Sequence, residues 1–150
     1  ADIAFVEGPI SHPQLARKVV GGDRIALYCG PDHPLADQAS LTPEDLVEAT
    51  WVMREPGSGT RDHAEVGLAS TGLDLAKLQI ALELPSNGAV LEAAEGGSLI
   101  AAVSELAAAS RVRAGMIQPL PWPLPERRFT MLRHCSRSIG RATEAFIASL

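Results

Sequence analysis

The sequence predicts an α/β fold with a mainly parallel sheet, and three observations support this prediction. Short apolar runs without helical spacing alternate along the chain with segments that do have helical spacing. Glycine and proline residues separate most of these segments, as expected for turns between strands and helices. With 150 residues, 46% of them hydrophobic, the chain can bury a core of its own.

The predicted strands are apolar runs bounded by turn residues. Gly8-Pro9 ends the first run and Gly30-Pro31 ends the second. Alternating prolines after the fifth run predict a stiff, extended segment before the last one. The predicted strands are residues 3–6, 24–29, 51–53, 78–84, 99–103 and 129–134.

The predicted helices follow these strands and begin at polar capping residues. Thr42 before Pro43 is typical of a helix start, because a hydroxyl caps the helix and proline fits its first position. Ser104 is a second expected N-cap, and Gly72 and Gly115 are expected to end two of the helices. One predicted helix begins at residue 43, and a second follows residue 61 and runs to about residue 71. The others cover residues 89–95, 104–113 and 138–150.

Charge and composition exclude several classes of protein. Thirteen Lys and Arg against 18 Asp and Glu give a net charge of −5, so we expect no intrinsic DNA binding. No apolar run approaches the ~18 residues of a membrane-spanning helix, and the first residues do not resemble a signal peptide. Cys29 and Cys135 have neither disulfide-framework nor zinc-site spacing. We therefore predict a cytoplasmic protein without a metal or cofactor.

The segment Gly57-Ser58-Gly59-Thr60-Arg61 is the sharpest local motif. It lies between a predicted strand and a predicted helix, where free backbone N–H groups and the helix dipole favour an anion. Its glycines let the backbone approach a ligand closely, its hydroxyls add hydrogen-bond donors and its arginine adds positive charge. It lacks the spacing and the lysine of a nucleotide-phosphate loop. The alternative from the residues alone is a capped turn with a solvated arginine.

Ser86-Asn87-Gly88 forms a second junction of the same kind and is, taken alone, simply a helix cap. Ligands of open α/β sheets bind beyond the carboxyl ends of the strands, which is where both junctions are expected. Together they favour a site for a small anion or a carboxylate.

An enzyme is less well supported by these residues. The four histidines lack metal-binding spacing, and the sequence has no GxSxG nucleophile motif. Cys135 follows His134 directly on a predicted strand, so their side chains are expected on opposite faces. We predict no catalytic residues.

The order of motifs resembles the effector-binding region of LysR-type transcriptional regulators, especially regulators of carbon-fixation and sulfur-assimilation genes. The resemblance rests on residues 2–9 (DIAFVEGP), 31–36 (PDHPLA), 41–46 (LTPEDL) and 51–61 (WVMREPGSGTR), and extends to the closing residues 145–147. It implies a fold like that of type II periplasmic binding proteins, with two lobes joined by crossing strands and an effector in the cleft between them.

Carried onto this sequence, the resemblance implies a domain organisation and a set of binding residues. Residues 1–30 and 118–150 would form a partial lobe I with the hinge strands, and residues 31–117 would form lobe II. The implied effector-binding residues are Glu7, Gly8, Gly57, Ser58, Gly59, Thr60, Arg61, Ser86, Asn87 and Gly88.

Two departures from the family pattern bear on the ligand. The usual Asn-Ser-Glu of the second junction is Ser86-Asn87-Gly88 here, and the usual Gly-Leu-Gly is Gly97-Ser98-Leu99.

The leading functional hypothesis is a domain that senses a small anionic or carboxylate effector for a regulator. That regulator would be a dimer or tetramer that binds promoter DNA only through a winged helix-turn-helix upstream of this sequence, with no membrane partner. The alternative hypothesis is a periplasmic-type solute-binding protein for a small anion.

The resemblance also implies that lobe I lacks its opening strands here. Phe5, Phe129, Leu132 and Phe146 should then be uncovered, and another chain or segment should cover them.

Overall fold

The computed structural model of the chain describes residues 2–7 and 10–150. The chain forms two compact units, which we call unit 1 (residues 1–23 and 126–150) and unit 2 (residues 24–125). The sequence predicted lobes that divide at residues 30 and 118, whereas these units divide at residues 23 and 126. The difference arises because residues 25–29 pair with strands of unit 2. The assignment of lobes stays a prediction.

Unit 2 is built on a mixed sheet. The sheet order is β6-β2-β5-β3-β4, in which β3 is parallel to β4 and β5, while β2 is antiparallel to β5 and β6. The prediction of a mainly parallel sheet was therefore wrong. The direction of a strand cannot be predicted from its own residues, because a buried strand has the same apolar composition in either direction. The strands are β2 (Leu15–Cys29), β3 (Thr50–Arg54), β4 (Gln79–Leu84), β5 (Ile100–Ser104) and β6 (Gln118–Pro119).

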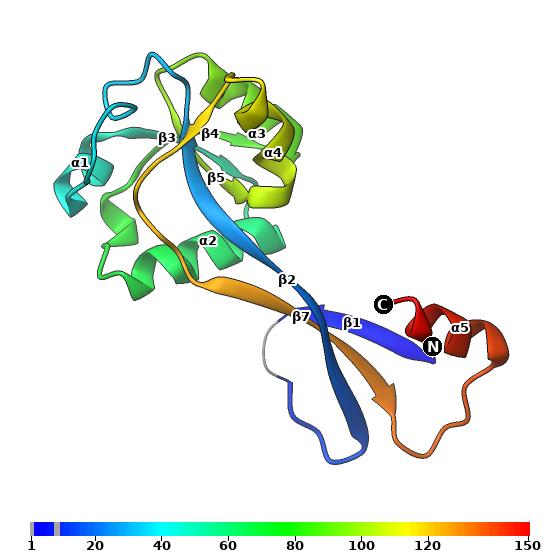
Figure 1. Cartoon of the computed structure of the whole chain (residues 1–150). Helices are drawn as coiled ribbons and strands as arrows, with labels where there is room; N and C mark the ends of the chain where they lie inside the picture. The colour runs from blue at the N-terminus through cyan, green and yellow to red at the C-terminus, as the bar shows by residue number, and fades with distance from the viewer. Residues whose placement is uncertain (1, 8–9) are drawn as a thin grey trace. The chain divides into compact units, whose positions relative to one another are not determined.

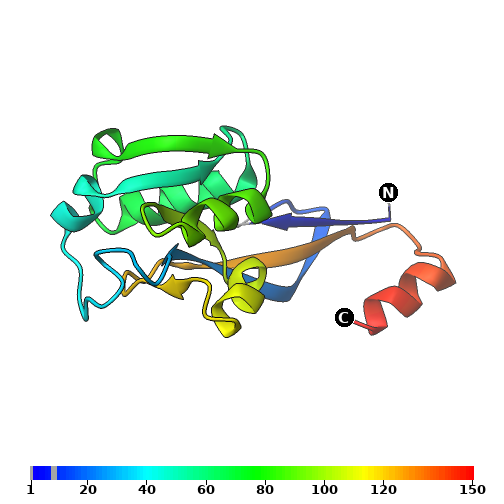
Figure 2. The same cartoon turned by 90° about the horizontal axis from the view of Figure 1, so that it is seen from above.

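Helices cover both faces of this sheet (Figures 1 and 2). On one face, Trp51 and Met53 of β3 belong to the same apolar cluster as Leu68 of α2. On the other face, Val52 of β3 belongs to a cluster with Val90 of α3. Alternate residues of one strand thus supply the two cores. The helices are α1 (Pro43–Glu48), α2 (Gly59–Ser70), the 3-10 turn η1 (Leu75–Lys77), α3 (Asn87–Glu95) and α4 (Glu105–Arg113).

Hydroxyl side chains cap the four α-helices of unit 2. Thr42 forms a reciprocal capping box with Asp45, as its position before Pro43 predicted. The other three caps are Ser58, Ser86 and Ser104, each of which accepts a hydrogen bond from the backbone N–H three residues later. These caps satisfy N–H groups that a helix start leaves without partners, so they fix where each strand-to-helix turn ends.

Unit 1 is described here on its own. Its strands are β1 (Ile3–Glu7), which pairs antiparallel with β7 (Glu126–His134), and the first part of β2, which neighbours β7. The prediction placed the start of β2 at residue 24, but the strand begins at Leu15. Charged residues and two adjacent glycines, Gly21 and Gly22, hide its first part from a search for apolar runs.

Helix α5 (Arg141–Ala148) closes unit 1 and begins later than the predicted residue 138. Phe146 of α5 meets Phe5 of β1 edge-to-face, with 6.2 Å between ring centroids. Both rings stay about half exposed, as expected from the sequence, but Leu132 is buried, contrary to that expectation. Phe129 is partly buried.

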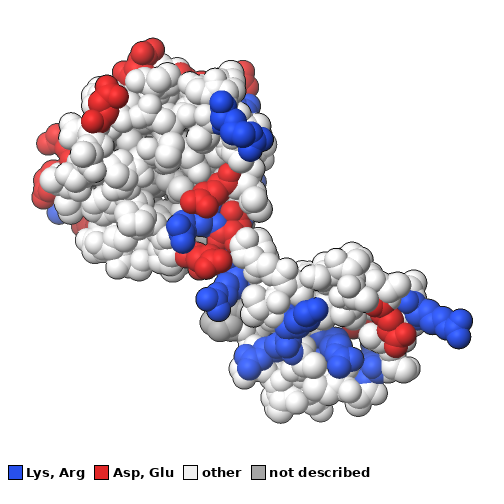
Figure 3. All heavy atoms as spheres, viewed as in Figure 1, with Lys and Arg blue, Asp and Glu red and all other residues white. Residues whose placement is uncertain are grey.

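The two units differ in charge. Unit 1 holds seven Lys and Arg against five Asp and Glu, a net charge of +2. Unit 2 holds six against thirteen, a net charge of −7. Figure 3 shows several Lys and Arg side chains gathered on one face of unit 1. An anion that binds to unit 2 therefore needs local donors that outweigh an unfavourable net charge. Within the described residues, no helix combines the length and the apolar character needed to cross a bilayer.

The two cysteines should differ sharply in reactivity. Burial, with a further contribution from Asp37, raises the pKa of the Cys29 thiol to about 11, whereas Cys135 is exposed. Because the thiolate is the reactive form, we expect a disulfide reagent at pH 8 to titrate one thiol per native chain and two per denatured chain. The variant Cys135→Ser should give none in the native state. Rapid native labelling of that variant would show that Cys29 is accessible.

Candidate functional site

The first candidate element is the turn from β3 into α2. The carbonyl of Glu55 accepts a hydrogen bond from the N–H of Ser58 at 3.2 Å, and Gly57 has a φ of +89°, a conformation that favours glycine. The hydroxyl of Ser58 then accepts from the N–H of Arg61 at 3.4 Å. Ser58 and Thr60 are both buried. The hydroxyl of Thr60 has no hydrogen-bond partner within the described part of the chain. The turn therefore presents two hydroxyls at the start of a twelve-residue helix.

Arg61 is not the solvated arginine that the alternative interpretation of this turn expected. Its Nε donates to Glu65 Oε1 at 2.8 Å, and its Nη1 donates to Glu83 Oε1 at 2.7 Å and to the Arg54 carbonyl at 3.0 Å. Only 11% of the side chain is exposed. Burial alone would lower the pKa of Arg61, but the two carboxylates raise it. Its two glutamate partners carry more negative charge than Arg61 carries positive charge.

The second candidate element is the turn from β4 into α3. The Ser86 hydroxyl caps α3 by accepting the N–H of Ala89 at 3.1 Å, as predicted for this position. Asn87 is the first residue of the helix, and a side chain added at Gly88 would meet nothing within 4 Å. The start of α3 is therefore open at its second residue.

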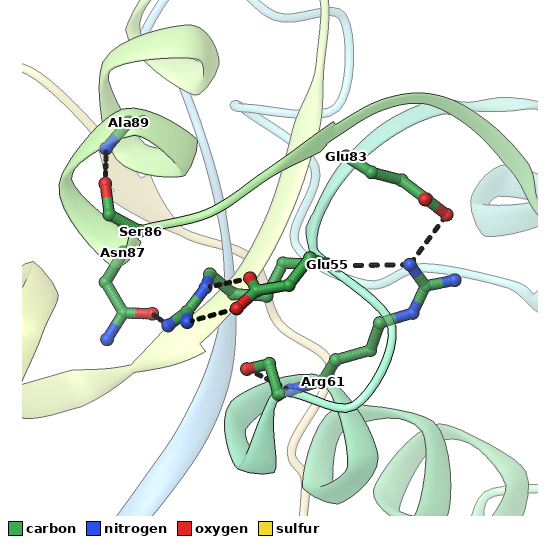
Figure 4. Close-up of polar contacts among 8 residues, drawn as sticks. Glu55, Arg61, Glu83, Ser86, Asn87 and Ala89 are labelled. Atoms are coloured by element: carbon green, nitrogen blue, oxygen red, sulfur yellow. Dashed lines mark hydrogen bonds and ion pairs between the residues drawn. The ribbon is translucent and has the colours of Figure 1, made fainter.

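Arg54 joins the two junctions, a role that we did not expect from the sequence. Its Nη1 donates to Asn87 Oδ1 at 2.8 Å, and its Nε and Nη2 donate to the two carboxylate oxygens of Glu55 at 2.7 and 3.0 Å (Figure 4). The hydrogen bond from Arg54 lowers the pKa of Glu55. The sequence feature that could have indicated this role is an arginine at the carboxyl end of a predicted strand, shortly before the Gly-Ser-Gly turn.

β3 and β4 are adjacent and parallel, which explains why the junctions meet. Their carboxyl ends lie at the same edge of the sheet, and the N–H of Glu55 donates to the carbonyl of Leu84 at 3.2 Å. Residues 57–61 and 86–88 therefore belong to one region of unit 2. Glu7 ends β1 in unit 1, and Gly8 lies outside the described residues.

The region holds several groups that can donate hydrogen bonds to an oxyanion. Its potential donors are the hydroxyls of Ser58 and Thr60, the amide of Asn87 and the guanidinium of Arg54. The N-terminal ends of α2 and α3 add their partial positive charge. The described residues hold no group of three or more His, Cys, Asp or Glu that could bind a metal ion.

Comparison with known proteins identifies the family. The model of the LysR substrate binding domain matches residues 1–150. The chain belongs to this family. Among curated relatives of this LysR domain, the HTH-type transcriptional regulator YeiE of Escherichia coli is 30% identical over 148 residues, covering 97% of the chain and 49% of YeiE. The RuBisCO operon transcriptional regulator of Acidithiobacillus ferrooxidans is 27% identical, covering 99% of the chain and 48% of the regulator.

Solved structures agree with this family in fold. The CcmR regulatory domain of Synechocystis PCC6803, determined in complex with 2-PG, superposes with a TM-score of 0.80 at 24% identity. The match covers 99% of this chain and 71% of that one. The LysR domain described here spans about half the length of the curated relatives it matches. Its likeness to a RuBisCO operon regulator confirms the expected kinship with regulators of carbon-fixation genes.

Proposed function

We propose that the LysR domain binds a small anionic or carboxylate effector where β3 and β4 lead into α2 and α3. The observation that carries this proposal is the meeting of two capped helix starts at one edge of the sheet. Ser58, Thr60 and Asn87 would supply hydrogen-bond donors, and Gly57, Gly59 and Gly88 would allow close approach. Ser86 would fix the start of α3, and Arg61, held by its two glutamates, would position the turn. Glu7 and Gly8 stay predictions of the sequence, because Gly8 lies outside the described residues.

We further propose that effector binding modulates DNA binding by the whole regulator. The relatives named above are transcriptional regulators, which favours this role over transport and over catalysis. DNA contacts would come from a helix-turn-helix outside this chain, in a cytoplasmic, self-associated protein. The effector would act by binding one arrangement of the regulator more tightly than another. The complex of CcmR with 2-PG supports a small anion as the class of ligand.

Removing the hydroxyls of the first turn should weaken effector binding. A screen by thermal shift with 2-PG, phosphate, sulfate and short carboxylates would first identify a ligand for the intact protein. We then expect Ser58→Ala and Thr60→Val each to cost about 1–3 kcal/mol of binding free energy, because a ligand oxygen loses its donor in a desolvated site. Isothermal titration calorimetry would measure the loss.

A matched control lies at the other end of the same helix. The Ser70 hydroxyl donates to the Gly67 carbonyl, far along α2 from the turn, so Ser70→Ala should leave the affinity unchanged. Unchanged affinity in both turn variants would remove this turn from the effector site.

A further inference from the structure

Within unit 2, two arginines lie at the candidate site, and their surroundings differ. Arg61 donates to two carboxylates and a backbone carbonyl and is almost enclosed. Arg54 has one carboxylate partner, Glu55, and one neutral partner, Asn87.

We propose that Arg54 is the residue that recognises the charge of the effector. In the absence of effector Glu55 pairs with Arg54, and the bound anion takes the place of the Glu55 carboxylate. This inference rests on the proposed function, because it assigns the selection of ligand charge at the same site. The ligands selected would carry a carboxylate, phosphoryl or sulfuryl group, each of which can accept two parallel hydrogen bonds from a guanidinium.

The exposure of the two side chains indicates which partner can leave. Arg54 is 18% exposed, whereas Glu55 is 42% exposed. Exposed ion pairs are weak unless their geometry is bidentate, and here both carboxylate oxygens of Glu55 accept from Arg54. The Glu55 carboxylate can therefore turn into solvent when an incoming anion replaces both hydrogen bonds. Arg54 would stay in place, because its Nη1 remains bonded to Asn87 Oδ1.

The backbone around Glu55 would not need to move. Its N–H donates to the Leu84 carbonyl, and its carbonyl accepts the N–H of Ser58. These two bonds hold the residue between β4 and the start of α2. Displacement of Glu55 is thus a side-chain rotation beside a fixed strand end.

Local charge makes the exchange necessary. The two arginines lie with three glutamates, Glu55, Glu65 and Glu83, so the group carries a net charge of −1. An anion added with Glu55 in place would meet like charge. A singly charged anionic group that replaces Glu55 leaves the local balance unchanged. Arg54 also retains N–H groups beyond the three that bond to described residues, and the Asn87 amide nitrogen has no partner among them.

The test measures the affinity of the intact protein for inorganic phosphate and for 2-PG by isothermal titration calorimetry. Glu55→Gln keeps the shape of the side chain and removes its charge, so affinity for both anions should rise about tenfold. Arg54→Gln should lower affinity by about tenfold or more. Glu95→Gln is the matched control, because Glu95 pairs with Arg111 at the far end of α3, outside the candidate site, and it should change affinity less than twofold.

A structural readout separates recognition from simple stabilisation. Circular dichroism and thermal unfolding of each variant would show whether its fold is intact. The nuclear magnetic resonance signal of the Arg54 Nε–H should shift on phosphate binding in the wild type, while that of Arg61 should not. An Arg54 signal that stays fixed at saturating phosphate would overturn the proposal.

The outcomes distinguish this inference from the proposed function. Stronger binding in Glu55→Gln together with weaker binding in Arg54→Gln supports it. Unchanged affinity in Glu55→Gln, or phosphate binding by neither that variant nor the wild type, overturns it. A ligand whose affinity depends on Thr60 but not on Arg54 or Glu55 would leave the proposed function standing and remove Arg54 from its recognition.

Discussion

Replacing Trp51 by alanine should lower the free energy of unfolding by about 3–5 kcal/mol. Trp51 is fully buried in the middle of β3, and its indole N–H donates to the carbonyl of Leu46 at 2.8 Å. The variant loses the packing of the largest side chain in this core and leaves a buried carbonyl without its donor. Urea unfolding followed by circular dichroism would measure the change.

The control for Trp51 is an exposed apolar residue of the same unit. Leu106 of α4 is 72% exposed, so Leu106→Ala should shift stability by less than about 0.5 kcal/mol. A Trp51→Ala variant as stable as the wild type would mean that β3 does not pass through the core.

Replacing Gly30 by alanine should cost about 1–3 kcal/mol of stability through overpacking. A Cβ at this position would lie 2.8 Å from the Glu95 carbonyl oxygen, 2.9 Å from the Ala94 carbonyl oxygen and 2.9 Å from the Gly97 nitrogen. All three are backbone atoms at the end of α3, so no side-chain rotation relieves the contact. Thermal and urea unfolding would both report the loss.

Gly88→Ala provides the opposite case. The position is in α3, has open space around it and does not have a positive φ. Because alanine favours the helix more than glycine does, this variant should be up to about 1 kcal/mol more stable than the wild type. If Gly30→Ala were as stable as Gly88→Ala, the close approach of residue 30 to the end of α3 would be refuted.

Much of unit 2 could be predicted from sequence, because its local signals agree with one another. Thr42, Ser86 and Ser104 were each expected to cap a helix and each does so. The apolar runs of β3 and β5 are short, fully buried and bounded by turns, which makes them easy to recognise.

The failures have a common physical origin in contacts between distant residues. The direction of β2 depends on which strands it joins, and β5 is some 75 residues away in sequence. The first part of β2 is stabilised by pairing in unit 1, although its own residues are charged or glycine. Leu132 is buried because of its place on β7, which residue type alone does not reveal.

At the candidate site, the sequence indicated the turns but not their electrostatics. The Gly-Ser-Gly-Thr motif has local causes, namely a capped helix and a glycine with positive φ. The partners of Arg61 and Arg54 include Glu83 and Asn87, which come from the next strand and helix. Such pairings appear only when parallel strands bring their ends together, so the distinction between the two arginines required the structure.

The division of the chain has a consequence for how the protein is made. Unit 2 is one uninterrupted stretch, whereas unit 1 consists of the two ends of the chain. A ribosome releases residues 24–125 in sequence, and they can complete their sheet while synthesis continues. Strand β1 must wait until β7 emerges more than a hundred residues later, because Phe5 pairs with Met131. During that interval β1 lacks its partner β7, so the strand pairing of unit 1 is completed after that of unit 2.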